Sequence, residues 1–234
     1  GSKQHGPHLP CGTDMMFIEA VAERVVAEGP VLLLPTLAYG YYPHFADWPG
    51  TISVSVQHFT GMVGDIIRSL ARYGMVKFLI LDGGVSPYPP LLTLSRDLHV
   101  ELGILVAVTN IRGLGEEAAA EVAEQESGGH ADEIETSCML AVRPDLVQMD
   151  RAVKGFLAAV PGTQDACGVT KVGIVQKLTE PHGVNGDATL ATVEKGEKVL
   201  AASVRDVVTF LEHFSDFPEP SGGTGSGCTQ AVVL

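Results

Sequence analysis

The sequence of 234 residues contains few basic residues, few cysteines and no long apolar run. Its 15 lysines and arginines stand against 28 acidic residues, which gives a formal net charge of −13, and they form no basic stripe. This balance argues against binding to nucleic acid or to anionic membranes. No run approaches the roughly 20 apolar residues of a membrane span, and no signal peptide precedes the first motif. We therefore expect a soluble, cytoplasmic protein.

The cysteines form neither a metal motif nor a disulfide framework. All four are widely spaced, with no CxxC pair, so reduced thiols are the simplest interpretation. Apolar residues make up 45% of the chain and charged residues 18%, which is a globular composition. We expect a single domain over residues 1–220, followed by a flexible, glycine-rich tail over 221–234.

Short apolar runs alternate with amphipathic stretches along the chain. The pattern predicts strands at 31–40, 51–56, 77–84 and 104–111, and helices at 14–28, 58–74, 91–103, 130–147 and 194–214. The stretch 116–129 should be a helix followed by a loop, 183–191 a loop, and GIVQ (173–176) is short and apolar. This alternation predicts a layered α/β fold with a mostly parallel sheet, in which ligands bind beyond the carboxyl ends of strands.

The opening stretch, GSKQHGPHLPCGTD, brings His5, His8 and Asp14 into one Gly/Pro-rich loop, with Lys3 among them. Loop residues of these types are often solvated, and Asp14 could simply cap the helix that follows. Alternatively, neutral imidazole and carboxylate groups from one loop could bind a divalent ion such as Zn²⁺ or Mn²⁺. The loop alone does not decide between these interpretations.

A second cluster, HADEIETS, offers His130, Asp132, Glu133 and Glu135 within six positions. Acidic residues favour the positive end of a helix, which explains two of the carboxylates but does not require the histidine. In a third stretch, LDGGVSPYPP, Asp82 could be a ligand or could hydrogen-bond the turn. The stretch is not a GxGxxG motif, and its prolines oppose a helix directly after the glycines, so we expect no dinucleotide site.

Together these stretches resemble the creatininase (creatinine amidohydrolase) family. The family's opening motif, G-S-x-E-Q-H-G-P-H-L-P-x-x-T-D, is similar to residues 1–14, and its H-A-x-E-x-E-T-S helix is similar to residues 130–137. DWPGTISVS (47–55) and GVNGDATLATVEKGEKVL (183–200) resemble two further family segments, in the right order.

The resemblance implies a three-layer α/β/α sandwich, a homo-oligomer (a hexamer or a dimer-based assembly) and a di-metal centre that activates water to cleave an amide C–N bond. On the matching positions it implies His5 and Asp14 as metal ligands, with Asp14 bridging two ions. It also implies Glu133 as the carboxylate of the second cluster and His130 as the histidine that moves protons to the leaving nitrogen.

The sequence departs from the family at two ligands. The family's ligating glutamate is Lys3 here, and Gly84 stands where the N-G-H-G-G-N loop has its histidine. An ammonium within ~4 Å of a divalent ion would be repelled by several kcal/mol even at an effective dielectric near 20. We therefore expect that Lys3 takes the place of one ion, which leaves at most one metal, or none, on His5, Asp14 and Glu133.

The expected function is a hydrolase acting on the amide, cyclic amide or lactone of a small molecule, with Lys3, His130 and Glu133 as its catalytic residues. Candidate contacts to the substrate are Trp48, Tyr88 and Ser86. The alternative is a family member that binds a ligand, or works without metal, and uses Lys3 as its cation or base. A scaffold subunit is a third and less favoured hypothesis.

Overall fold

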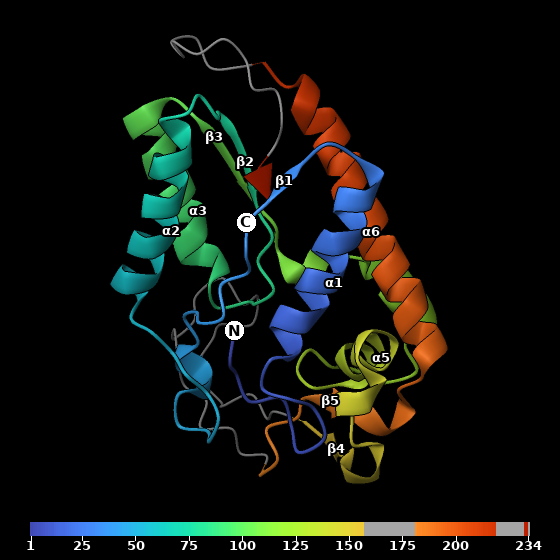
Figure 1. The fold of residues 1–234 in the computed structure, drawn as a ribbon. Helices are drawn as coiled ribbons and strands as arrows, with labels where there is room; N and C mark the ends of the chain where they lie inside the picture. The colour runs from blue at the N-terminus through green and yellow to red at the C-terminus, as the bar shows by residue number, and fades with distance from the viewer. Residues whose placement is uncertain (157–180, 219–231, 234) are drawn as a thin grey trace, which may run out of the picture.

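A computed structural model describes residues 1–156, 181–218 and 232–233 (Figure 1). The helices are α1 (Thr13–Glu28), α2 (Val56–Ala71), α3 (Tyr88–Leu102), α4 (Glu116–Val122), α5 (Glu133–Val142) and α6 (Val193–Asp216). One sheet contains the strands β1 (Leu32–Leu33), β2 (Lys77–Ile80), β3 (Leu105–Val108) and β6 (Val232–Val233). A separate antiparallel pair is formed by β4 (Lys154–Gly155) and β5 (Gly186–Asp187).

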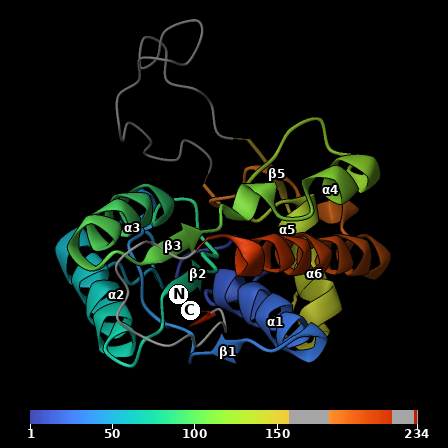
Figure 2. The same ribbon diagram turned by 90° about the horizontal axis from the view of Figure 1, so that it is seen from above.

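The main sheet has the order β1-β6-β2-β3, and all of its described pairs are parallel. Helices α2 and α3 lie on one side of it and α1 and α6 on the other, as the view from above shows (Figure 2). The three-layer α/β/α arrangement is thus confirmed. Among the described residues, no helix is both long enough and apolar enough to cross a membrane.

The strand β2 is buried on both faces, as expected for the interior of a parallel sheet. Phe78 and Ile80 pack into the cluster formed with α2 and α3, whereas Leu79 packs into the cluster formed with α1 and α6. Because successive side chains of a strand point to opposite faces, this one strand separates two hydrophobic cores. The strand ends at Ile80, so its carboxyl end places Asp82 at the edge where α1 begins.

The predicted strand over 51–56 is wrong. Ser53 makes only an isolated bridge to Gly40, and Ser55 caps α2 by accepting a hydrogen bond from the backbone N–H of His58. A serine at this position favours a helix start over strand continuation. The predicted strand over 31–40 is also shorter than expected: among the described residues of this stretch, only Leu32 and Leu33 form a strand.

The next helix does not begin directly after Gly84, as expected, but it begins three residues before the predicted start at 91. Helix α3 begins at Tyr88, so Pro89 and Pro90 occupy its first turn. A proline is tolerated there because the first backbone N–H groups of a helix have no intrahelical acceptor.

The predicted flexible tail over 221–234 is wrong for Val232 and Val233. These two residues form β6 between β1 and β2, and the backbone N–H of Leu34 donates to the carbonyl of Val233 at 2.9 Å. Residues 219–231 and the short apolar stretch 173–176 lie outside the described residues.

Candidate catalytic cluster

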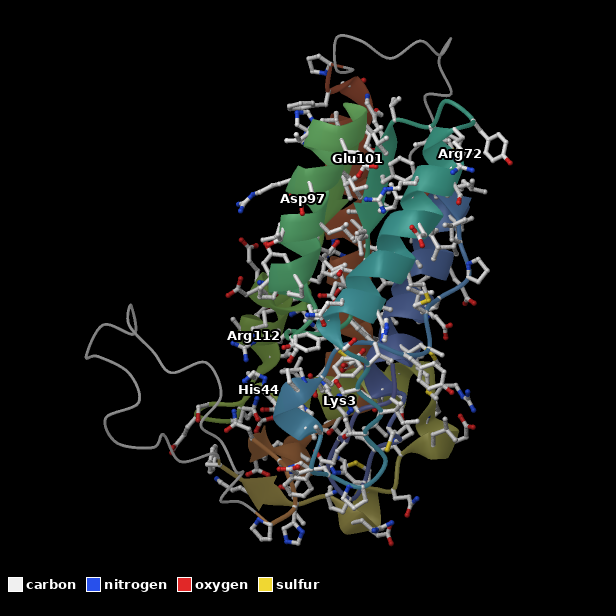
Figure 3. All side chains as sticks on the ribbon, turned by 90° about the vertical axis from the view of Figure 1, so that its left-hand side faces the viewer. Lys3, His44, Arg72, Asp97, Glu101 and Arg112 are labelled. Atoms are coloured by element: carbon white, nitrogen blue, oxygen red, sulfur yellow. The ribbon has the colours of Figure 1, made fainter. Side chains whose placement is uncertain are left out.

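A buried ion pair lies at the centre of the N-terminal loop. The Nζ of Lys3 is 2.8 Å from Oδ2 of Asp14, and their side chains are only 7% and 5% exposed. The ammonium also lies 5.3 Å from the ring centre of Phe45 and 5.8 Å from that of Tyr42. Phe45 belongs to the short 3₁₀ turn η1 (Pro43–Phe45), which carries the labelled His44 near Lys3 in Figure 3.

Asp14 does not cap α1, which excludes one of the two interpretations of this residue. Gly12 occupies the N-cap position, and no side chain caps that end. Although burial opposes its ionisation, the charges of Lys3 and His5 hold the pKa of Asp14 below its ordinary value. Asp14 is therefore ionised, and its two oxygens face Lys3 and His5 within the cluster.

Lys3 stays protonated. Burial alone would lower the pKa of its ammonium, but the charges of Asp14 and Glu135 and the hydrogen bond to Asp14 raise it overall. A lysine acts as a base or forms a Schiff base only after it loses this proton. The arrangement therefore favours Lys3 as a fixed cation and argues against the role of base.

His5 is oriented by its own loop. Its Nδ1 is 2.9 Å from the carbonyl oxygen of Lys3, and a carbonyl can only accept, so Nδ1 carries a proton. The other ring nitrogen, Nε2, faces Asp14 Oδ1 at 2.8 Å and Glu135 Oε2 at 3.7 Å. A carbonyl that holds the outer N–H of a histidine is the usual support of a metal ligand.

His130 is oriented in the same way from the opposite side. Its Nε2 lies 3.2 Å from Oε1 of Gln4, whose amide nitrogen donates to the carbonyl of His182 at 2.8 Å. Since the amide nitrogen of Gln4 is used there, its oxygen accepts from His130, and Nε2 carries the ring proton. The free lone pair is on Nδ1, 3.8 Å from Glu135 Oε2.

Three possible ligand atoms converge as a result. One nitrogen each of His5 and His130 and one carboxylate oxygen of Glu135 lie within 4.8 Å of one another. The two imidazole rings are 4.7 Å apart, and Phe45 packs on His130 with the ring centres 4.3 Å apart. Burial raises the pKa of Glu135, although His5 and Lys3 oppose this shift.

Glu133, the carboxylate assigned from the sequence, lies elsewhere. Its side chain is fully buried and accepts hydrogen bonds from the backbone N–H groups of Glu124 and Gln125, while Lys195 supplies its counter-charge at 2.5 Å. Helix α5 begins at Glu133, so residues 133 and 135 point in different directions. The structure thus brings Glu135, and not Glu133, to the histidines.

The loop that carries His130 is held by Gln125 and Asp132. The Asp132 side chain caps α5 through the N–H groups of Ile134 and Glu135, and it also accepts from Gly129 and Gln125. The amide oxygen of Gln125 accepts from the backbone of Asp187. The predicted helix over 130–147 is shorter in the structure: α5 begins at Glu133, with Asp132 as its cap, and ends at Val142.

His8 does not join the cluster. Its Nε2 is 2.8 Å from the hydroxyl of Thr136, and burial together with the charge of His5 lowers its pKa to about 4. The remaining nitrogen is buried without a hydrogen-bond partner. His8 is a neutral core residue that links the N-terminal loop to α5.

The third stretch forms a turn. Oδ1 of Asp82 accepts from the backbone N–H of Gly84 at 3.0 Å, which supports the turn interpretation, while Oδ2 has no partner. A Cβ at Gly84 would lie 3.1 Å from Pro87 and 3.2 Å from Tyr42, so this position is closely packed.

The three candidate substrate contacts occupy different surroundings. Ser86 lies 3.4 Å from Nδ1 of His44, Tyr88 opens α3, and Trp48 follows η1. Ser86 is connected to the cluster only indirectly, through His44 and its neighbour Phe45, which packs on His130. Trp48 and Tyr88 make no described contact with the ligand atoms.

Among the described residues, the donor set fits one divalent ion, which would take the place of the hydrogen bond between His5 Nε2 and Asp14 Oδ1. Two imidazole nitrogens and a carboxylate oxygen form the three-ligand set of catalytic zinc sites. A second ion would need Asp14, but one oxygen of Asp14 faces the Lys3 ammonium and the other faces His5. The Coulomb repulsion from Lys3 opposes a second cation at that place.

Comparisons with known proteins agree with the resemblance found in the sequence. Residues 3–211 match the family model for creatininase, described as creatinine amidohydrolase. The chain is 29% identical to creatinine amidohydrolase of Pseudomonas putida, over 92% of this chain and 86% of the relative. It is 30% identical to a mycofactocin precursor peptide peptidase of Mycobacterium tuberculosis, over 94% and 84%. A manganese creatininase structure is similar at a TM-score of 0.77 and 28% identity, over 93% and 88%.

Proposed function

The chain belongs to the creatininase family of amidohydrolases, and we propose that it cleaves a C–N amide bond, cyclic or linear, or a lactone of a small molecule. The proposal includes one divalent ion, zinc or manganese, held by His5, His130 and Glu135. The observation that carries it is the convergence of three ligand atoms, two of them from histidines that outer hydrogen bonds orient. When bound, such an ion would lower the pKa of a water molecule and polarise a carbonyl.

Lys3 provides the fixed positive charge that the second ion supplies in the di-metal centre implied by the family. Its ammonium pairs with one oxygen of Asp14 and has three donors, which leaves donors for a substrate oxygen. The neighbouring rings of Tyr42 and Phe45 exclude water, so a developing negative charge on that oxygen is stabilised in a less polar environment. Lys3 therefore orients and stabilises, and it does not exchange its proton.

Glu135 takes the role that the sequence assigned to Glu133. Its Oε2 lies 3.7 Å from Nε2 of His5 and 3.8 Å from Nδ1 of His130, so it is the carboxylate that completes a ligand set with the two histidines. His130 holds its own proton on Nε2 against Gln4, which keeps its other nitrogen directed at Glu135. Gln4 and Lys3 thus act as the supports of the two histidines.

A second candidate is a metal-free or ligand-binding protein that uses Lys3 in place of a metal. The observation in its favour is that Asp14 already has two partners, Lys3 and His5, at 2.8 Å each. Activity that survives chelation would support this candidate and would contradict a metal hydrolase.

The experiment is a turnover assay on a panel of cyclic amides, linear amides and lactones, with creatinine included. We expect hydrolysis that is lost on chelation and restored by zinc or manganese. Lys3→Ala should reduce kcat/KM by about 100-fold, the usual effect of removing one oxyanion donor. If Lys3→Ala turns over as fast as the parent protein, the role given to Lys3 is wrong.

Assembly and location are also proposals. The family resemblance supports a homo-oligomer, and the absence of a membrane-spanning helix among the described residues is compatible with a cytoplasmic protein. Light scattering on the purified protein would measure the assembly, and a monomer at all concentrations would contradict it.

A further inference from the structure

Ala131, which lies between His130 and the cap residue Asp132, has an unusual backbone conformation. Its φ is +49°, and among the described residues no other non-glycine residue has a positive φ. This left-handed region is disfavoured for a residue with a Cβ, and it persists only where the surrounding structure enforces it. Strain of this kind gathers at binding and catalytic sites, and here it lies next to a proposed metal ligand.

The turn around Ala131 is held from both sides. Before it, His130 and Asn185 exchange backbone hydrogen bonds at 3.3 Å and 2.8 Å. After it, Asp132 caps α5 and also accepts from the backbone N–H of Gly129 at 2.7 Å. The methyl group of Ala131 is fully buried, in a hydrophobic cluster with Leu9, Met139 and Val184. These contacts keep the strained conformation in place.

The strained turn determines where the carboxylate of Glu135 points. Asp132 and Glu135 have the spacing of a capping box, in which the side chain at the third helical position returns to the backbone N–H of the cap residue. Here Oε2 of Glu135 instead accepts from the backbone N–H of Ala131, the residue before the cap, at 2.6 Å. Among the described residues this is the only hydrogen bond to that carboxylate, so its orientation depends on Ala131.

We propose that Ala131 is a positioning residue for the metal ligand Glu135. Its left-handed conformation turns the N–H group toward Oε2, and this oxygen then lies 3.7 Å from Nε2 of His5 and 3.8 Å from Nδ1 of His130. The inference rests on the proposed single-ion site and adds to it a backbone group that orients the third ligand. Loss of an outer hydrogen bond to a metal ligand typically lowers metal affinity by about 10–100-fold.

The test measures zinc affinity by competition with a chromophoric chelator. Ala131→Gly keeps the N–H group and accepts a positive φ without strain, so we expect an affinity within about twofold of the parent protein. Ala131→Val makes the left-handed conformation much less favourable, because its side chain is β-branched, and should lower the affinity at least about tenfold. As the matched control, Ala188→Val adds the same volume at another fully buried alanine, in the 3₁₀ turn η5 (Ala188–Leu190), and should leave the affinity unchanged.

A second replacement removes the N–H group without adding volume. Lactic acid in place of Ala131 keeps the methyl group but puts an ester oxygen where the N–H was, and it should also lower zinc affinity at least about tenfold. In the Glu135→Gln background, Ala131→Val should cause no further loss of the weak zinc binding that remains on the two histidines, because its effect acts through Glu135.

Unchanged zinc affinity in the lactic acid protein, or a further loss in Glu135→Gln/Ala131→Val, would overturn the role of Ala131. A loss in Ala188→Val as large as that in Ala131→Val would overturn it as well. A parent protein that binds zinc but hydrolyses none of the amides and lactones would contradict the proposed function alone, since the affinities do not depend on turnover. A parent protein that binds no zinc would contradict both.

Discussion

The N-terminal loop (residues 3–14) and helix α5 each contain a buried carboxylate that pairs with a lysine, yet the two pairs are built differently. Asp14 depends on two side chains, Lys3 and His5, for its partners. Glu133 pairs with Lys195, and it also accepts hydrogen bonds from the backbone N–H groups of residues 124 and 125. The first pair faces the histidines, whereas the second pair joins α5 to α6.

This difference separates a functional carboxylate from a structural one. A carboxylate held by backbone groups cannot turn toward a substrate or an ion without breaking the loop that holds it. One held by side chains can exchange partners when a ligand arrives. Glu135 lies between the two types: its Oε2 accepts one backbone hydrogen bond from Ala131 at 2.6 Å, fewer than Glu133 accepts, and it also faces two histidines.

The largest expected effect comes from breaking the ion pair of the N-terminal loop. Lys3→Met leaves the buried Asp14 charge uncompensated, and we expect a loss of about 3–5 kcal/mol in the free energy of unfolding. Lys195→Met should cost less, about 1–3 kcal/mol, because Glu133 keeps its backbone hydrogen bonds. Urea unfolding of the chelated proteins measures both.

The double variant Lys3→Met/Asp14→Asn is the control for this prediction. It removes the stranded charge and should recover most of the stability lost in Lys3→Met. Equal losses of stability in Lys3→Met and Lys195→Met would show that the backbone hydrogen bonds of Glu133 do not compensate for the loss of its lysine.

The next effect separates the two glutamates by activity. Glu135→Gln should lower kcat/KM by about 100-fold, or about 2.7 kcal/mol, and leave stability nearly unchanged. Glu133→Gln should do the reverse, with less than about fivefold loss of activity and a lower free energy of unfolding. A larger activity loss in Glu133→Gln than in Glu135→Gln would return the catalytic role to Glu133.

The smallest effect is a pH dependence of stability from His8. Its pKa is lowered to about 4 in the folded protein, from an ordinary value of 6.5, so the unfolded chain binds this proton first. The contribution of His8 is therefore complete above the unfolded pKa and is lost as the pH falls from about 6.5 to about 4.

Urea unfolding at about pH 7 and about pH 5 should show a drop in stability, of which His8 contributes of order 1 kcal/mol. His8→Gln keeps a partner for Thr136 but does not titrate, so it should show a smaller drop. The same slope in both proteins would assign the effect to other groups, of which His130 is one, since its pKa is also lowered.

Much of the fold could be predicted from periodicity. The long amphipathic helix α6 and the buried strand β2 follow directly from their patterns of apolar residues. The central place of β6 could not be predicted, because a two-residue strand after a glycine-rich stretch has no periodic signal. The prediction of a strand at 51–56 was wrong because Ser55 caps a helix. The alternation of apolar and polar residues does not reveal this cap.

Within the site, residue types were more informative than their orientation. Lys3, His5, Asp14 and His130 do lie together in the structure, and the charge argument for a single ion depends only on their identity. The choice between Glu133 and Glu135 depends on which side of α5 each faces and on the loop at 124–125. Asp132 caps α5 and so determines where the helix begins. Aspartate is a preferred N-cap residue, so the sequence offered a signal for this helix start.

The most direct test of the single-ion site is the metal content of the purified protein after reconstitution with zinc or manganese, measured by elemental analysis. We predict about one ion per chain, lost in His5→Ala and in Glu135→Gln but retained in Glu133→Gln. Two ions per chain, or one ion that survives Glu135→Gln and is lost in Glu133→Gln, would contradict the assignment of Lys3 as the replacement for a second metal and of Glu135 as the ligand.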